Sequence, residues 1–244
     1  DGPDMSGLTY EWTVDGAVVV GADSDSITIT DAAIGAHTVG LTVRNGAGDT
    51  KDAETGVFKV RPSEVFVSRT GSHEYPFNSW QTAATNVNEA FTTLWKMSNV
   101  TSVLHLAEGE YSVSEQMIIT TPFVFAGAGV DRTVLKAAKS GYRCMQIGNA
   151  DADVYGLTVS GFTSPALTGA GVYISVGTFR DSRVTRCNCT MYDGSEGGGV
   201  RIAGGTVTNC EIDNNKIVQA HGYAHGGGVL ISNGTMENCT VVDN

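Results

Sequence analysis

The stretch Gly197-Gly-Gly-Val-Arg-Ile-Ala-Gly-Gly-Thr-Val-Thr-Asn-Cys-Glu-Ile-Asp-Asn-Asn215 recurs 29 residues later as Gly226-Gly-Gly-Val-Leu-Ile-Ser-Asn-Gly-Thr-Met-Glu-Asn-Cys-Thr-Val-Val-Asp-Asn244. A weaker copy begins 28 residues upstream, at Gly169. Repeats of this length are typical of solenoids, in which each copy is one structural unit stacked on the next. The repeat therefore predicts a coil of short strands, with one turn of the coil per copy.

The apolar pattern within one copy predicts which side chains face the interior of this coil. Val200 and Ile202 alternate on one strand, and Val207 follows the glycine pair at 204–205. The alternation breaks at Asn209, which we expect at a sharp corner because asparagine tolerates the left-handed conformation. Stacked turns lie about 4.8 Å apart. The period then places Asn209 on Asn238 and Cys210 on Cys239, as a structural ladder.

The composition of the whole chain agrees with many short strands and many turns. Glycine supplies 31 of the 244 residues, whereas charged residues make up only 17%. The formal net charge is −11, which disfavours nucleic acid as a partner because like charges repel. No apolar segment is long enough for a membrane span. The odd number of cysteines, five, favours buried free thiols over a fully paired disulfide framework.

The first 62 residues predict a separate small antiparallel β-domain. Alternating apolar residues begin at Leu8, and Asp15-Gly16 is a hairpin signal. Tyr10-Glu-Trp-Thr-Val-Asp-Gly16 and Gly35-Ala-His-Thr-Val-Gly-Leu-Thr-Val-Arg-Asn-Gly46 resemble the PKD/Ig-like modules of bacterial extracellular proteins. The resemblance implies an Ig-like β-sandwich over residues 1–62 that serves as a spacer or adhesive unit.

Residues 63–244 are expected to form the coil, beginning with a helix. The apolar spacing from Trp80 to Trp95, after Ser79 as N-cap, predicts an amphipathic helix that covers the first turn. Phe77-Asn-Ser-Trp80, Ala107-Glu-Gly-Glu-Tyr111 and Gly127-Ala-Gly129 are similar to the N-terminal cap and first coils of pectin-lyase-like proteins. The Gly-Gly-Gly-Val and Asn-Cys-Thr-Val repeats also resemble bacterial surface and autotransporter-type adhesins. These resemblances imply an all-β chain with a right-handed parallel β-helix and an N-terminal capping α-helix.

Candidate binding residues fall in two groups. The first combines Asp181 and the nearby arginines with residues farther along the chain, which would line a surface groove. The second is a glycine-rich loop that interrupts the repeats and carries two histidines and a tyrosine, which would hold a metal or stack on a sugar. From these groups we single out Asp193, Glu196, Arg201, His221, Tyr223 and His225. No catalytic residue is assigned. No cofactor is required, and Ca²⁺ is the ion that the carboxylates would suit.

The sequence leaves two functions open. One is a secreted or cell-surface protein, adhesive or structural, with a β-helix stalk that binds polysaccharide or a cell-surface glycan. The alternative is a polysaccharide lyase or glycoside hydrolase of the pectin-lyase-like fold. Because the chain stops at Asn244 directly after a repeat, we expect the β-helix to be truncated there, and its uncapped turn to be a surface for self-association.

Overall fold

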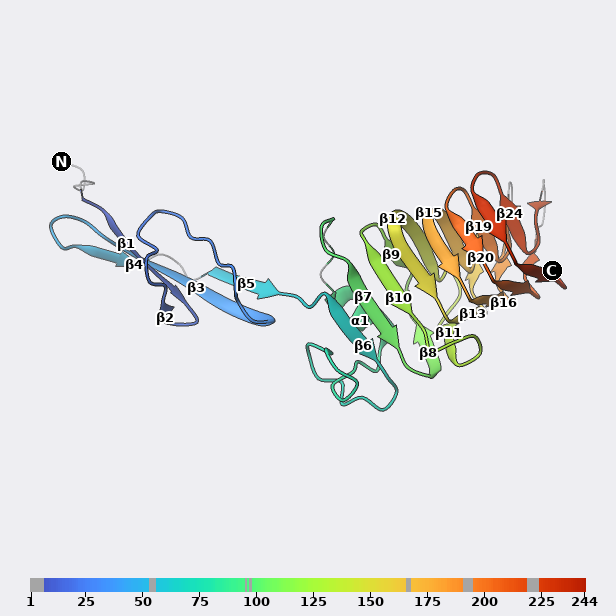
Figure 1. Cartoon of the computed structure of the whole chain (residues 1–244), viewed down its shortest axis with the longest axis horizontal. Coiled ribbons are helices and arrows are strands. Elements are labelled where there is room, and N and C mark those ends of the chain that lie inside the picture. Colours follow the sequence, from blue (N-terminus) through green and yellow to red (C-terminus); the bar gives the residue numbers. More distant parts are fainter. Residues whose placement is uncertain are drawn as a thin grey trace. The chain divides into compact units, whose positions relative to one another are not determined.

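A computed structural model describes residues 7–52, 56–94, 96, 98–165, 168–190, 195–218 and 224–244. The chain divides into two compact units, residues 1–61 and residues 62–244. Strands dominate both units, and the described residues contain one α-helix, so the predicted all-β class is confirmed. Figure 1 shows the strands of each unit.

The first unit contains one antiparallel sheet among its described residues. Its strands are β1 (Thr9–Val14), β2 (Ala17–Val18), β3 (Gly35–Arg44), β4 (Thr50–Asp52) and β5 (Gly56–Val60). The order is β2-β1-β3-β4, with β5 also paired to β3. Asp15 and Gly16 both have positive φ, as a tight hairpin turn requires. A second sheet, which a sandwich needs, is not seen within residues 7–52 and 56–61.

One face of this sheet carries its apolar side chains. Tyr10 and Trp12 lie opposite Val43 and Leu41 in the register of β1 and β3. Trp12 also donates from its indole nitrogen to the carbonyl of Ser24 at 2.9 Å, which ties the irregular segment after β2 to the sheet. Ile27 and Ile29 alternate as in a strand, but they belong to that irregular segment.

The second unit is a parallel β-solenoid, as the repeats predicted. Its longest column of strands runs in the order β24-β19-β15-β12-β10-β7-β6, and every pair in the column is parallel. The column consists of β6 (Glu64–Val67), β7 (Ser102–Leu106), β10 (Phe123–Ala126), β12 (Met145–Tyr155), β15 (Val172–Arg180), β19 (Val200–Ile202) and β24 (Val229–Ile231), joined by β9 (Met117–Ile119), β20 (Thr206–Thr208) and β25 (Thr235–Glu237).

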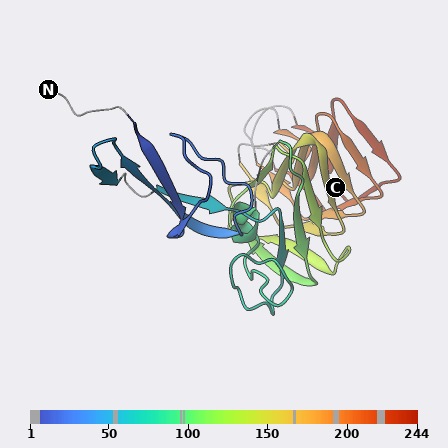
Figure 2. The same ribbon diagram turned by 60° about the vertical axis from the view of Figure 1, so that its left-hand side comes forward.

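The other columns follow around each turn of the coil, as Figures 1 and 2 show. The second column runs β26-β21-β16-β13-β11-β8, and two short columns run β14-β17-β22 and β18-β23. Their strands are β8 (Gly109–Val113), β11 (Thr133–Ala137), β13 (Thr158–Ser160), β14 (Thr163–Ser164), β16 (Arg183–Thr185), β17 (Asn188–Cys189), β18 (Ser195–Glu196), β21 (Glu211–Asp213), β22 (Lys216–Ile217), β23 (Ala224–His225) and β26 (Thr240–Val242).

The core of the solenoid is a stack of apolar side chains inside the coil. Val200 pairs with Val229 and Val207 with Met236, so the period of 29 is the register between the last two turns. Val200, Ile202, Val207, Cys210 and Ile212 are all buried, on the alternation that the sequence predicted.

Two columns of left-handed residues form the corners of the later turns. The first corner is formed by Gly156, Asp181, Asn209 and Asn238, and the second by Gly161, Arg186, Asn214 and Asp243; all eight have positive φ. Glycine, asparagine and aspartate adopt this conformation most readily, which explains the residue types at seven of these positions.

The side chains that follow the second corner point into the coil. Phe162 and Cys187 fill this position on earlier turns, and Asn215 and Asn244 fill it on later turns. Asn215 donates from Nδ2 to Asn244 Oδ1 at 3.0 Å and to the carbonyl of Val184 at 3.0 Å. A buried amide ladder therefore joins consecutive turns at this corner. The ladder predicted at Asn209 and Asn238 belongs to the first corner and stays a prediction.

The helix is shorter than predicted and begins later. It is α1 (Val87–Thr93), and Asn86, not Ser79, is its N-cap: the Asn86 side chain accepts hydrogen bonds from the backbone of Asn88 and Glu89. The residues before it are extended, because Ala84 exchanges backbone hydrogen bonds with Phe66 and Ser68 beside β6. Its buried side chains contact β6 and β8. This described helix is too short to cross a membrane.

Candidate functional site

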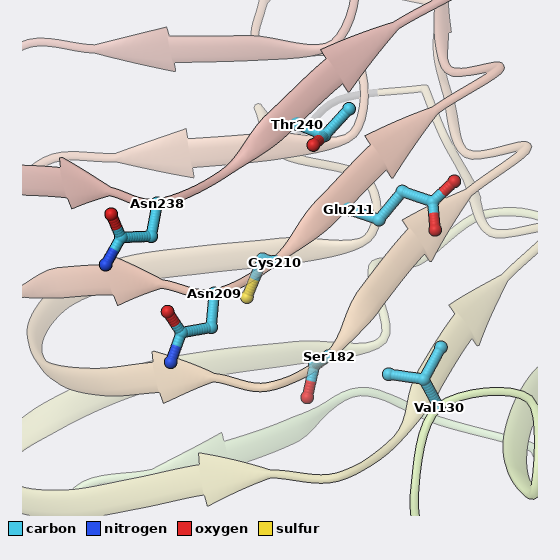
Figure 3. A pocket seen from close by; sticks show the side chains of 7 residues that line it. All are labelled: Val130, Ser182, Asn209, Cys210, Glu211, Asn238 and Thr240. Carbon is cyan, nitrogen blue, oxygen red and sulfur yellow. The ribbon is translucent and has the colours of Figure 1, made fainter.

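A groove of about 560 Å³ runs across consecutive turns at the first corner of the solenoid. Figure 3 shows its lining: the Asn209 and Asn238 amides lie on neighbouring turns and are directed to the same side, with Ser182 and Val130 farther along. The complete lining is Val130, Ser182, Asn209, Cys210, Glu211, Asn238 and Thr240. The groove therefore repeats an amide and a polar strand residue on two consecutive turns.

The fold explains why polar side chains gather at this corner. The left-handed backbone at Asn209 and Asn238 interrupts the strand alternation, so both side chains leave the core and remain exposed. The next residue, Cys210, turns back into the coil. The following residue faces outward again, which places Glu211 and Thr240 beside each other in the register of β21 and β26.

One wall of the groove is fixed by a charged cluster around Asp181. Asn209 donates from Nδ2 to Asp181 Oδ1 at 3.0 Å, and Arg180 donates to the other oxygen at 2.6 Å. These hydrogen bonds, the one from Asn209 first, lower the pKa of Asp181. Arg180 is held in turn by two bonds to Asp153 and lies 4.0 Å from the centre of the Tyr155 ring.

A second charged cluster lies on the outer face of β16 and β21. Arg183 donates to both carboxylate oxygens of Asp213, at 2.8 and 2.9 Å, and Thr185 donates to one of them at 3.0 Å. The Asp213 side chain is only 2% exposed. The bond from Arg183 is the main reason that the pKa of Asp213 falls to about 2. Asp131 and Glu211 flank the same guanidinium, at 3.4 and 3.8 Å.

The shifted carboxyl groups beside the groove are held in their ionised form. The carboxyl groups with a shifted pKa among the described residues are Asp15, Asp181 and Asp213, and each is shifted downward by hydrogen bonds. The groove offers exposed amide, hydroxyl and carboxylate groups, and the Asn209 amide is held by its bond to Asp181.

The residues singled out from the sequence lie elsewhere on the coil or outside the described residues. Asp193, His221 and Tyr223 lie outside them. Glu196 pairs with His225 in the register of β18 and β23, and Arg201 lies between Tyr173 and Leu230 on the longest column. None of these described positions lines the first-corner groove. No group of three or more possible metal ligands is found among the described residues, so Ca²⁺ gains no support from them.

Several residues of the groove and of the charged clusters beside it were not predicted, because they are far apart in the sequence. Asp181 and its neighbouring arginines had been noted, but Asp131, Asp213, Glu211 and Ser182 had not. The signal was present in the repeat itself: Ser182, Cys210 and Cys239 occupy equivalent positions, as do Arg183, Glu211 and Thr240.

Comparisons with known proteins do not identify a family for this chain. No protein-family model matches the chain, and neither a curated protein nor a solved structure matches it.

Proposed function

We propose that this protein is an extracellular, non-catalytic surface or adhesive protein whose solenoid binds polysaccharide in the first-corner groove. The observation that carries the proposal is the groove itself: exposed polar side chains repeat from turn to turn, while the adjacent carboxylates are ionised and held by arginines. A polymer with regularly spaced hydroxyl groups suits such a repeating array of hydrogen-bond donors and acceptors.

The finer aspects of the fold belong to the same proposal. We interpret the first unit as a PKD/Ig-like spacer. Its hairpin, and the pairing of Tyr10 and Trp12 on β1 with apolar residues of β3, support this interpretation. We interpret the second as a right-handed β-helix of the pectin-lyase-like or adhesin type, with α1 as its N-terminal cap; the packing of α1 on β6 and β8 supports this role. A spacer followed by a rod is an arrangement suited to displaying a binding surface away from a cell.

The charge of the groove indicates the class of glycan. Glu211 lines the groove, and Asp131 and Asp213 lie beside it around the one guanidinium of Arg183. Two or more carboxylates around one cation leave a negative potential, which repels uronic acids and sulfated sugars. A neutral polysaccharide or one with amino groups is therefore favoured over an acidic one.

The test is affinity electrophoresis of the full chain through gels that contain neutral, acidic or amino polysaccharides. We expect retardation in a neutral or amino polysaccharide and none in an acidic one. Migration that is unchanged in every gel would contradict the proposal. The Glu211→Gln variant should reduce the discrimination against acidic polymers, because it removes a charge and keeps the shape of the side chain.

The alternative function, a lyase or hydrolase, predicts turnover. A lyase releases unsaturated products that absorb in the ultraviolet, and a hydrolase releases reducing ends. We expect neither product after prolonged incubation with the polysaccharide that binds. Product release that disappears in the Asp213→Asn or Asp181→Asn variant would replace the binding proposal with the enzymatic one.

A further inference from the structure

Two cysteines occupy equivalent interior positions on consecutive turns. The pairs Thr208–Glu237 and Glu211–Thr240 flank them in the register of the parallel strands. Cys210 therefore stacks on Cys239, and the backbone nitrogen of Cys210 donates to the Sγ of Cys239 at 3.4 Å. The two thiols also share a conformation, because each Sγ contacts the carbonyl two residues before it, at 3.2 Å for Cys210 and 3.1 Å for Cys239.

The spacing of the strands suits a covalent bond between these cysteines. Neighbouring strands lie about 4.8 Å apart. This spacing falls within the range of about 4.4–6.8 Å that Cα atoms span across a disulfide. The Cα spacing therefore suits a disulfide that keeps the register of the strands.

We propose that Cys210 and Cys239 form a disulfide between consecutive turns by exchange with a low-molecular-weight disulfide. Cys239, the more exposed of the two, loses its proton and attacks one sulfur of the small disulfide, forming a mixed disulfide and releasing one small thiolate. Cys210 then loses its proton and attacks the Cys239 sulfur, which expels the second thiolate. Two protein thiols are oxidised, one small disulfide is reduced, and the two protons go to the two released thiolates.

The other three cysteines lack this arrangement. Cys189 lies opposite Ser164 and Ile217 on its neighbouring turns, and the backbone of Cys187 is bonded to the side chain of Asn215 on the next turn. Cys144 and Cys187 are completely buried, and burial raises the pKa of Cys187 to about 12. Burial also raises the pKa of Cys210 to about 12, which is why the exchange begins at Cys239.

Trypsin separates the two cysteines into different peptides, which makes the test unambiguous. Cleavage after Arg201 and Lys216 gives the peptides 202–216 and 217–244, each with a single cysteine. The full chain is incubated with oxidised glutathione, free thiols are alkylated, and the digest is analysed by mass spectrometry without reduction. We expect the two peptides linked, with the loss of two hydrogen atoms, and a thiol titre lower by two than the five of the reduced chain.

Two results would overturn the proposal: recovery of both peptides alkylated, or recovery of both as glutathione adducts. The Cys239→Ser variant is a matched control, because Ser182 already occupies the equivalent position on an earlier turn. In this variant Cys210 should be recovered alkylated. If Cys210 instead appears linked to another cysteine, the geometric argument for the Cys239 partner is wrong. Because the test needs no polysaccharide, its outcome is independent of the proposed glycan binding.

Discussion

The amide of Asn215 is bonded to the amide of Asn244, with 3.0 Å between Nδ2 and Oδ1, and this contact joins two turns inside the solenoid. Asn215 Oδ1 accepts a further hydrogen bond from the backbone of Cys187 at 2.9 Å, so three successive turns meet at this side chain. The ladder is fully buried at Asn215, where water cannot replace a lost bond.

Removing this amide is expected to destabilise the solenoid. Asn215→Ala leaves the Cys187 nitrogen and the Val184 carbonyl without their partner, and each buried unsatisfied group costs about 1–3 kcal/mol. We expect a loss of about 2–4 kcal/mol in the free energy of unfolding, measured by urea titration. The matched control is the exposed neighbour in Asn214→Gly, which keeps the left-handed corner. Equal stability of the two variants would show that the ladder contributes little.

Glycine is expected to be required for stability at the repeat positions that pack against the Asn215 ladder. A methyl group at Gly199 would lie 2.6 Å from Cγ of Asn215 and 2.9 Å from the carbonyl oxygen of Gly228. Overpacking of this kind costs about 1–3 kcal/mol. Gly199→Ala should therefore lower the urea midpoint, whereas Gly148→Ala, whose added methyl meets its nearest atom at 3.4 Å, should leave it nearly unchanged. Similar midpoints would contradict the close packing of the backbone.

The corner columns predict a stabilising substitution. Arg186 is exposed and has φ of 56°, while Gly161 occupies the same corner on the previous turn. A left-handed backbone costs a residue with a side chain about 1–2 kcal/mol. Part of that cost is offset by the greater freedom of glycine in the unfolded chain. Arg186→Gly should raise the thermal midpoint, and Asn209→Ala should lower it. A lower thermal midpoint for Arg186→Gly would mean that the arginine side chain stabilises the fold by more than its left-handed backbone costs.

The pair of Arg183 and Asp213 predicts a loss of stability in acid. Because the pKa of Asp213 is lowered from 3.8 to about 2 in the folded chain, its contribution is complete above pH 4 and is lost as the pH falls toward 2. Arg183→Met should raise this pKa and, by leaving a buried carboxylate without its partner, cost about 3 kcal/mol near neutral pH. Unfolding free energies between pH 2 and pH 7 check both points; a variant with the acid profile of the wild type would contradict the assignment.

The first unit predicts a pH dependence of the opposite sign. Asp15 bonds the His37 ring at 2.7 Å, and this bond is the main cause that raises the pKa of His37. A raised histidine pKa stabilises the folded unit at low pH, and that contribution is lost as the pH rises through the folded value. The pKa of Asp15 is lowered, so the pair weakens again in strong acid.

Nuclear magnetic resonance titration of the His37 ring measures this effect. The folded chain should show a higher pKa for His37 than the urea-unfolded chain. In the Asp15→Asn variant, which retains a residue suited to the left-handed turn, the difference should shrink. A titration curve that is identical in wild type and variant would show that the ion pair has no influence on His37.

The repeat made the solenoid, its register and the corner at Asn209 predictable, because all three follow from a fixed period and from alternating apolar residues. The amide ladder at Asn215 was less visible. The equivalent position holds phenylalanine and cysteine on earlier turns, so the pattern changes residue type along the column. The sequence places the helix start too early because Ala83 and Ala84 fit a helical stripe equally well, and only the pairing of Ala84 with β6 makes this segment extended. The charged clusters depend on contacts between residues such as Arg183 and Asp131, 52 positions apart, which no local pattern reveals.

The central claim, that the first-corner groove binds polysaccharide, is tested most directly by one affinity comparison. The dissociation constant for the polysaccharide that retards the wild type is measured for the Asn209→Gly/Asn238→Gly double variant and for Asn214→Gly at the second corner. All three substitutions keep a left-handed backbone, but only the first two remove amides from the groove. We predict binding at least about tenfold weaker for the double variant, equivalent to about 1.4 kcal/mol, and unchanged binding for Asn214→Gly. Equal affinities for the double variant and the wild type would contradict the claim.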